Sequence, residues 1–246
     1  MIYHSSPMIQ DELAAKYLEN PLNPVMFMQY DQKHPGFENL IEPAPELQRQ
    51  FNIRHLYNKL KSETPTNNLL CIGSPSAGKS DRLNDMFSVS FEKRDPRACG
   101  LWHDSVDVIF SSNDIPLGFN VYDFHGKMAN YDFQMIADLF EWLPNTYLLV
   151  QVIDKSYLEK LQNGVGDATF EMMKQRMIIV SNTKNESKKD EIEQVAGGFG
   201  IRGADTQDNN LRHGFYHFGD LGNGDQQKAM AEEIFKKLQQ NTKALK

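Results

Sequence analysis

The segment Gly73-Ser74-Pro75-Ser76-Ala77-Gly78-Lys79-Ser80 decides the fold of this chain, because it matches the spacing G-x-x-x-x-G-K-[ST] at every fixed position. An apolar run, 69–72, precedes it, and a run that predicts a helix follows it from Asp81. In this strand–loop–helix setting the glycines let backbone N–H groups close around phosphate groups, and the helix N-terminus adds a positive dipole end. The segment therefore predicts a phosphate-binding loop, or P-loop, at residues 73–80.

Two side chains of the P-loop have defined roles in this chemistry. We expect Lys79 to reach the β- and γ-phosphates of a nucleotide and the Ser80 hydroxyl to hold Mg²⁺. Asp123 ends a later apolar run, where the acidic partner of the same ion is expected. Gly126 completes a D-x-x-G pattern with Asp123, and in GTP-binding proteins this glycine offers its N–H to the γ-phosphate.

Composition limits the classes of function. The 246 residues carry a formal net charge of −7 and no long basic run, which disfavours general nucleic-acid binding. The two cysteines, Cys71 and Cys99, have no paired spacing that predicts a disulfide framework or a zinc site. No apolar run approaches the roughly 18 residues of a transmembrane helix, and the N-terminus lacks the pattern of a signal peptide. We therefore expect a soluble, cytoplasmic protein without a transmembrane segment.

Apolar runs and helical patterns alternate from residue 69 onward, which is typical of a mostly parallel sheet with helices on both faces. The apolar runs are 69–72, 106–110, 118–122, 147–153, 177–180 and 214–218, and the helical patterns are 79–87, 133–143, 156–173 and 225–238. Residues 111–117 are too few for a helical crossover, so the runs that flank them are expected to pair antiparallel. The pattern predicts a three-layer α/β fold, a P-loop nucleotide domain whose six-stranded sheet has one antiparallel strand.

Residues 1–66 differ from the rest of the chain. Short helices are predicted at 11–20 and 45–61, and apolar residues of the second one share a face. The polar residues 62–68 are typical of a linker. We therefore expect a small helical N-terminal extension at 1–66 and a nucleotide domain at 67–246.

With these motifs in order, the chain resembles the G domain of P-loop GTPases. More narrowly, it resembles the large inducible GTPases: the dynamin, guanylate-binding and very large interferon-inducible groups. The loop 73–80 is similar to the dynamin-type P-loop, Cys99-Gly100-Leu101-Trp102 resembles a Gly-x-Trp switch region, and 119–126 looks closest to the very large inducible group. The resemblance covers about residues 68–242. It implies GTP and GDP binding with Mg²⁺, slow GTP hydrolysis, and nucleotide-dependent association with a second copy or a protein partner.

The resemblance also implies a base-reading segment after the fifth strand, where the family carries N/T-K-x-D. Here Thr183-Lys184-Asn185-Glu186 occupies that place, with Glu for Asp. Guanine presents two adjacent donors that a carboxylate accepts, whereas adenine would leave the carboxylate unpaired. Thr183, Lys184 and Glu186 are therefore the expected contacts to a guanine base. An ordinary solvated surface loop is the alternative.

Three positions depart from the pattern of the hydrolysing relatives. Lys127 stands where many GTPases have the Gln that orients the attacking water. Ser76 stands where guanylate-binding proteins carry a P-loop Arg, and no Thr lies between Ser80 and Asp123 to complete the Mg²⁺ shell. The catalytic candidates are Lys79, Ser76, His125 and Lys127; Arg94 and Arg97 are candidate arginine fingers, and Ser88, Ser90 or Ser105 would replace the missing Thr.

Three functions stay open at this point. The first is a slowly hydrolysing GTPase whose nucleotide state orders the loops 88–105 and 123–132. The second is an ATP-dependent ATPase or kinase with Asp123 as its metal-binding acid, which the predicted antiparallel hairpin disfavours. The third is a nucleotide-binding interaction module without turnover, an alternative that the missing Gln and Thr keep open.

Overall fold

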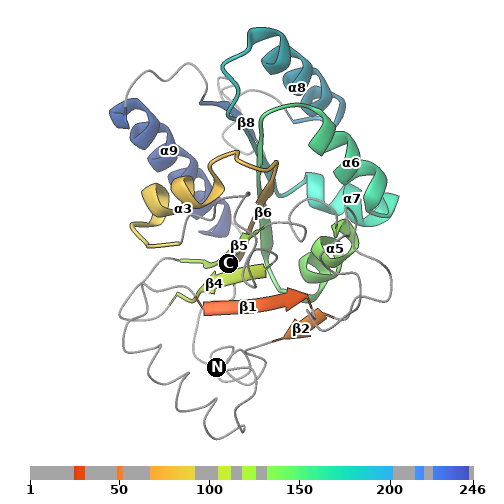
Figure 1. Cartoon of the computed structure of the whole chain (residues 1–246), viewed down its shortest axis with the longest axis vertical. Helices are drawn as coiled ribbons and strands as arrows, with labels where there is room; N and C mark the ends of the chain where they lie inside the picture. Colours follow the sequence, from red (N-terminus) through yellow and green to blue (C-terminus); the bar gives the residue numbers. More distant parts are fainter. Residues whose placement is uncertain are drawn as a thin grey trace, which may run out of the picture.

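A computed structural model of the chain describes residues 25–30, 49–51, 67–91, 105–111, 118–125, 132–201, 214–218 and 224–243. They form an eight-stranded sheet in the order β2-β1-β4-β5-β3-β6-β7-β8, flanked by helices (Figure 1). The strands are β1 (Val25–Tyr30), β2 (Arg49–Phe51), β3 (Asn68–Gly73), β4 (Ser105–Ile109), β5 (Asn120–Phe124), β6 (Thr146–Val152), β7 (Met177–Ser181) and β8 (Gly214–His217). The helices are α3 (Lys79–Phe87), α5 (Phe133–Trp142), α6 (Ser156–Gly164), α7 (Asp167–Lys174), α8 (Glu186–Gly198) and α9 (Gly224–Lys243).

The central strands confirm the predicted α/β fold. β3 pairs in parallel with both β5 and β6, and the parallel pairing continues through β7 to β8. β4 pairs antiparallel with β5, as the short connection between them predicts. In this register Asp107 of β4 lies directly opposite Asp123 of β5, and Cys71 of β3 lies opposite Asp123 on the other side. Because the P-loop follows β3, it lies at the carboxyl end of the parallel strands, where ligands bind in open α/β sheets.

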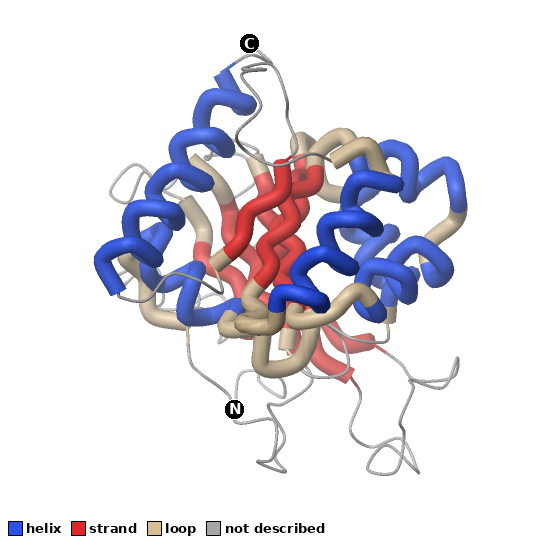
Figure 2. The backbone as a smooth tube through the Cα atoms, turned by 90° about the horizontal axis from the view of Figure 1, so that it is seen from above, coloured by secondary structure: helices blue, strands red, loops and turns tan. Residues whose placement is uncertain are grey.

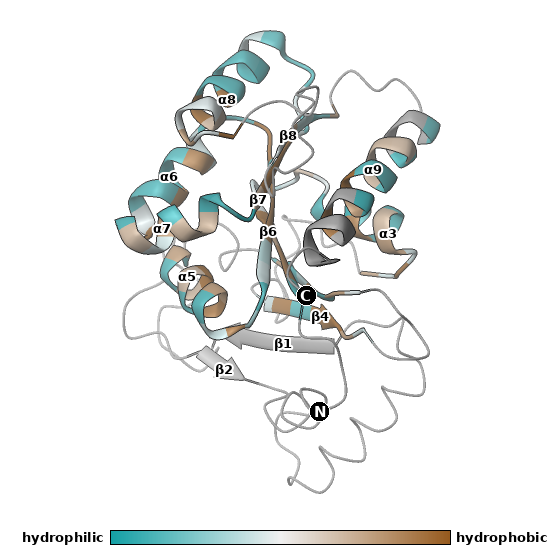
Figure 3. Ribbon diagram, turned by 180° about the vertical axis from the view of Figure 1, so that it is seen from behind, coloured by the Kyte–Doolittle hydropathy of each residue, from teal (hydrophilic) through white to brown (hydrophobic). Residues whose placement is uncertain are grey.

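Helices cover both faces of the sheet, which makes three layers (Figure 2). Alternate residues of each strand face opposite layers, so Leu70 and Ile72 join one apolar cluster while Leu69 and Cys71 join the other. The first cluster packs against α5, α6, α7 and α8, and the second packs against α3 and α9. Apolar residues predominate in the strands around β7 and β8, and hydrophilic residues cover much of α8 (Figure 3). The P-loop therefore joins a fully buried strand to the layer that α3 and α9 form.

The helical layer differs from the sequence prediction in two places. The single helix predicted over 156–173 is two helices, α6 and α7. Val165, after the end of α6, and Gly166, before the start of α7, both have an extended backbone, which breaks the helix. A Cβ on Gly164 would lie 2.8 Å from the Phe133 ring, so the glycine lets α5 approach this break closely. Helix α8 was not predicted, because Ile192 and Ala196 are its only buried residues and leave little apolar periodicity.

The N-terminal part of the chain adds strands to this sheet. β1 pairs antiparallel with β4 and with β2, so residues 25–30 and 49–51 extend the edge beyond the six predicted strands. The helix predicted over 45–61 is wrong at 49–51, because these residues pair with β1, a partner that local periodicity does not reveal. The helix predicted at 11–20 lies outside the described residues, and the domain boundary at 66 stays a prediction. Among the described helices, none combines the length and apolarity needed to cross a membrane.

Candidate functional site

The P-loop backbone has the conformation that a tight phosphate loop requires. Gly73 has a φ of 145°, and a Cβ at this position would lie 1.8 Å from the Gln151 carbonyl oxygen, so only glycine fits. Gly78 has a φ of 75° and precedes the first turn of α3, which no side chain caps. Ser76 also has a positive φ of 58°, and its side chain is exposed at the tip of the loop. An uncapped helix N-terminus behind a strained loop leaves backbone N–H groups available for an anion.

Lys79 folds back over the loop. Its Nζ donates to the carbonyl oxygens of Ser74 at 3.1 Å and Gly73 at 3.4 Å. Burial lowers the pKa of Lys79, and the nearby Asp123 carboxylate opposes this shift. The ammonium group therefore lies at the mouth of the loop, bonded to neutral carbonyls that a phosphate would replace with a stronger, charge-assisted partner.

Ser80 and Asp123 meet as the sequence predicts. The Ser80 hydroxyl donates to Asp123 Oδ2 at 2.6 Å across the gap between α3 and β5. The other carboxylate oxygen, Asp123 Oδ1, is buried and has no hydrogen-bond partner among the described residues. Burial raises the pKa of Asp123, whereas His125, the Ser80 hydroxyl and Lys79 each lower it. A buried carboxylate oxygen without a partner beside a hydroxyl is a donor set that fits Mg²⁺, which takes hard oxygen ligands.

His125 is buried against the same carboxylate. Its Nε2 lies 3.3 Å from Asp107 Oδ2 and 3.5 Å from Asp123 Oδ2, without a well-aligned hydrogen bond to either. Ser105 donates to Asp107 Oδ1 at 3.4 Å, and the His125 backbone N–H donates to the Ser105 carbonyl at 2.8 Å. The imidazole lies between the side chains of two acidic residues on adjacent strands, and its interaction with Asp123 opposes the rise that burial causes in the pKa of that carboxyl. His125 thus contacts the expected metal ligand and is only 6% exposed.

The segment after β7 approaches the P-loop through a residue that the sequence pattern did not single out. The Asn182 side chain donates to the Ala77 carbonyl oxygen and, at 3.1 Å, to Gln151 Oε1. Thr183 is buried and its Oγ1 accepts the Asn185 N–H at 3.2 Å, which turns the chain into α8. Among the described residues of this segment, Asn182 is therefore the one whose side chain contacts the P-loop.

Lys184 and Glu186, the other two predicted base contacts, are exposed. Glu186 is the first residue of α8, and its carboxylate lies 3.4 Å from Lys189 Nζ. Asn185 caps the helix by accepting the Lys188 N–H at 3.2 Å. Thr183 is thus buried, whereas the Lys184 and Glu186 side chains are in contact with solvent.

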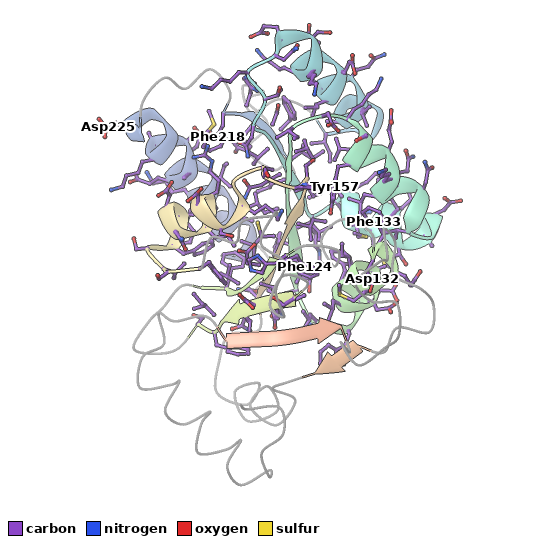
Figure 4. All side chains as sticks on the ribbon, viewed as in Figure 1. Phe124, Asp132, Phe133, Tyr157, Phe218 and Asp225 are labelled. Carbon is purple, nitrogen blue, oxygen red and sulfur yellow. The ribbon has the colours of Figure 1, made fainter. Side chains whose placement is uncertain are left out.

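Two further side chains, which the sequence pattern did not single out, connect elements around the P-loop. Tyr157 of α6 reaches the start of the P-loop, where a backbone hydrogen bond from Gly73 partly offsets the rise that burial causes in its pKa (Figure 4). Arg82 of α3 places its guanidinium 4.2 Å from the centre of the Phe218 ring, just after β8. The phosphate loop, α3 and the end of β8 are thereby held together.

Several predicted site residues lie outside the described residues: Gly126, Lys127, Arg94, Arg97 and the segment 99–102. Of the serines considered for the missing Thr, Ser88 ends α3 and Ser90 is exposed. Ser105 is buried and donates to Asp107. The structure therefore brings together the P-loop, Asp123 and His125.

No protein-family model matches the chain. No curated protein sequence matches it either. Among solved structures, Toc33 from Arabidopsis thaliana in complex with Mg²⁺ and GMPPNP matches with 13% identity and a TM-score of 0.41, over 74% of this chain and 88% of that chain. A second match is the ADP-ribosylation factor-like GTP-binding protein, small COPII coat GTPase SAR1, from Encephalitozoon cuniculi in complex with GDP. It has 11% identity and a TM-score of 0.37, over 94% of this chain and 89% of that chain. Similarity at this level does not establish a shared activity.

Proposed function

We propose that the chain binds a guanine nucleoside triphosphate with Mg²⁺ at the P-loop and hydrolyses it slowly. The observation that carries the proposal is the 2.6 Å hydrogen bond between Ser80 and Asp123, two residues that are 43 positions apart. It joins the hydroxyl that ends the P-loop to the carboxylate that ends a neighbouring strand. A chance match to the loop pattern would not require a buried acid at this place, whereas a nucleotide site with Mg²⁺ does.

The residues of the site have separate tasks in this proposal. Ser80 and Asp123 hold Mg²⁺, which neutralises phosphate charge when it is bound. Lys79 exchanges its two carbonyl partners for phosphate oxygens. As water attacks the γ-phosphorus and the bond to the β-phosphate oxygen breaks, the Lys79 ammonium and the P-loop N–H groups stabilise the charge that develops on the oxygens. His125 lies beside the Asp123 carboxylate, and Ser76 and Lys127 are the candidates for contact with the γ-phosphate.

The guanine preference rests on the segment after β7. Asn182 ties this segment to the P-loop, so a nucleotide whose phosphates occupy the loop would have its base near residues 182–186. Glu186 is exposed, and the partner of its carboxylate within the described residues is Lys189 of the same helix, so the carboxylate can accept the two donors of guanine. Thr183 and Lys184 complete the proposed base contacts.

A nucleotide-binding module without turnover is the second candidate, and the burial of His125 favours it. His125 faces two carboxylates, so this imidazole is not placed to orient a water molecule against the γ-phosphate. In both candidates the nucleotide orders the loops 88–105 and 123–132, and that order controls association with a second copy or a protein partner. A cytoplasmic location belongs to the same proposal.

Phosphate release with the bound nucleotide quantified separates these candidates. Purified protein is incubated with GTP or ATP and Mg²⁺, and nucleotide content and inorganic phosphate are measured together. The proposal predicts bound GTP and slow phosphate release, both lost in Lys79→Ala and retained in Lys188→Ala, a matched exposed lysine. Bound GTP without phosphate release would favour the module, and equal use of ATP would contradict the guanine preference.

A further inference from the structure

Gln151 is a polar residue in the middle of the sheet. It belongs to β6, which lies between β3 and β7, and its side chain is fully buried. Leu149 and Tyr147, two and four positions before it on the same face of β6, belong to the apolar cluster that packs against α3 and α9. Burying an amide in such a place destabilises the fold unless its donors and acceptor are bonded. The contacts of this side chain therefore show what the residue holds together.

Each polar group of Gln151 contacts a different part of the site. Nε2 donates to the Lys79 carbonyl oxygen at 3.3 Å, at the first turn of α3. Oε1 accepts from Asn182 Nδ2 at 3.1 Å, in the segment after β7. The Gln151 backbone carbonyl accepts the Ser74 N–H at 2.8 Å, at the other end of the P-loop. One residue of the central strand thus bonds both ends of the P-loop and the next loop along the sheet.

Asn182 closes a ring of contacts around the P-loop. Its Nδ2 donates to the Ala77 carbonyl as well as to Gln151, and its backbone N–H donates to the Val152 carbonyl at 2.8 Å. The Asn182 amide thereby bonds Ala77 in the middle of the P-loop, while Gln151 bonds Ser74 and Lys79 near its two ends. Neither the P-loop nor residues 182–185 can shift without breaking bonds to the other.

We propose that Gln151 is a positioning residue that locks the P-loop to the segment 182–185, so that phosphate binding and base binding are coupled through one buried amide. The inference rests on the proposed nucleotide site and names how its two halves communicate. Gln151 contacts protein groups and not the reacting atoms. Its loss would weaken nucleotide binding by letting each loop move alone, and the base preference would fall because the base loop would no longer be held in register with the phosphates.

A double-mutant cycle on nucleotide binding tests this coupling. Gln151→Met keeps the volume and removes the amide contacts to Lys79, Asn182 and the Cys71 sulfur, and Asn182→Ala removes the Asn182 amide. We expect each single variant to bind GTP about tenfold more weakly, and the double variant to lose clearly less than the roughly hundredfold product, because both substitutions break the bond between Gln151 and Asn182. The preference for GTP over ATP should fall in all three variants. An additive, roughly hundredfold loss in the double variant would overturn the proposal.

Hydrogen exchange of the nucleotide-free protein gives a second readout that does not depend on nucleotide. Gln151→Met should raise exchange in both 77–82 and 182–185, whereas Val150→Ala, a buried neighbour on the opposite face of β6, should raise it throughout the sheet without singling out these segments. If Gln151→Met fails to fold, Asn182→Ala should still raise exchange in 77–82. A response in only one segment would overturn the coupling. Failure of the wild type to bind nucleotide, together with a joint response of both segments, would refute the proposed function and support the linkage.

Discussion

The close approach of Gly73 to the backbone of β6 gives a prediction that can be tested without a ligand. In Gly73→Ala the new Cβ would lie 1.8 Å from the Gln151 carbonyl oxygen and 2.7 Å from the Gln151 carbonyl carbon. These neighbours are backbone atoms of the central strand β6, so no side-chain rotation relieves the overlap. β3 and β6 must separate at this point, and the 2.8 Å hydrogen bond from the Ser74 N–H to the same carbonyl is lost.

The size of the effect follows from these terms. The lost hydrogen bond costs about 1 kcal/mol, and separating β3 from β6 to relieve the overlap costs about 1–3 kcal/mol, as overpacking a core does. We therefore expect Gly73→Ala to lower the free energy of unfolding by about 3 kcal/mol. For a chain of this size that corresponds to a fall in Tm of roughly 6–12 °C.

Thermal unfolding of the nucleotide-free protein measures this effect against a matched glycine. Gly118 has a positive φ of 79°, but a Cβ there would meet nothing within 4 Å. Gly118→Ala therefore carries the backbone strain without the steric overlap, and its Tm should fall only by a few degrees. Equal losses of Tm in the two variants would refute the reasoning, because they would show that the overlap with β6 contributes nothing.

Three further predictions concern single side chains. Ser80→Ala should remove most of the Mg²⁺ dependence of nucleotide affinity, measured by titration with and without a chelator, and unchanged dependence would exclude Ser80 as a ligand. Burial raises the pKa of the Cys71 thiol. In a Cys99→Ser background this thiol should therefore resist a disulfide reagent at pH 8 until urea unfolds the protein. Rapid labelling of the native protein would contradict the buried position of Cys71. Burial, aided by Glu233, raises the pKa of Tyr216 from 10.0 to about 12, so its neutral form stabilises the fold below pH 10 and that contribution is lost as pH rises through 12. Urea unfolding between pH 9 and 12 should show a smaller loss of stability in Tyr216→Phe, and an identical loss would refute this assignment.

The sequence predicted the sheet well because its central strands are buried on both faces. Such strands are nearly continuous apolar runs, and β3, β6 and β7 are buried along their whole length. The short connection before β5 was enough to predict the antiparallel pair. The edge strand β2 was missed because a three-residue strand has no periodicity of its own and forms only through its pairing with β1.

The candidate site was predictable where its chemistry is local in the sequence. The P-loop is a contiguous segment, and Asp123 follows an apolar strand in the expected order, so both were found. Gln151 and Asn182 were not found. A lone Gln in an apolar run and an Asn before Thr183 become recognisable as site residues only when the order of the strands brings them next to the P-loop. Asp107 was missed for the same reason, since only the antiparallel register places it opposite Asp123.

Calorimetric titration with non-hydrolysable GTP and ATP analogues in Mg²⁺ tests the central claim most directly. The variants are Lys79→Ala, Glu186→Ala and Glu193→Ala, the last an exposed glutamate of α8 that serves as the control. We expect a strong preference for the GTP analogue in the wild type and in Glu193→Ala, loss of that preference in Glu186→Ala, and no binding in Lys79→Ala. Equal binding of the two analogues by the wild type, or no binding at all, would contradict the central claim.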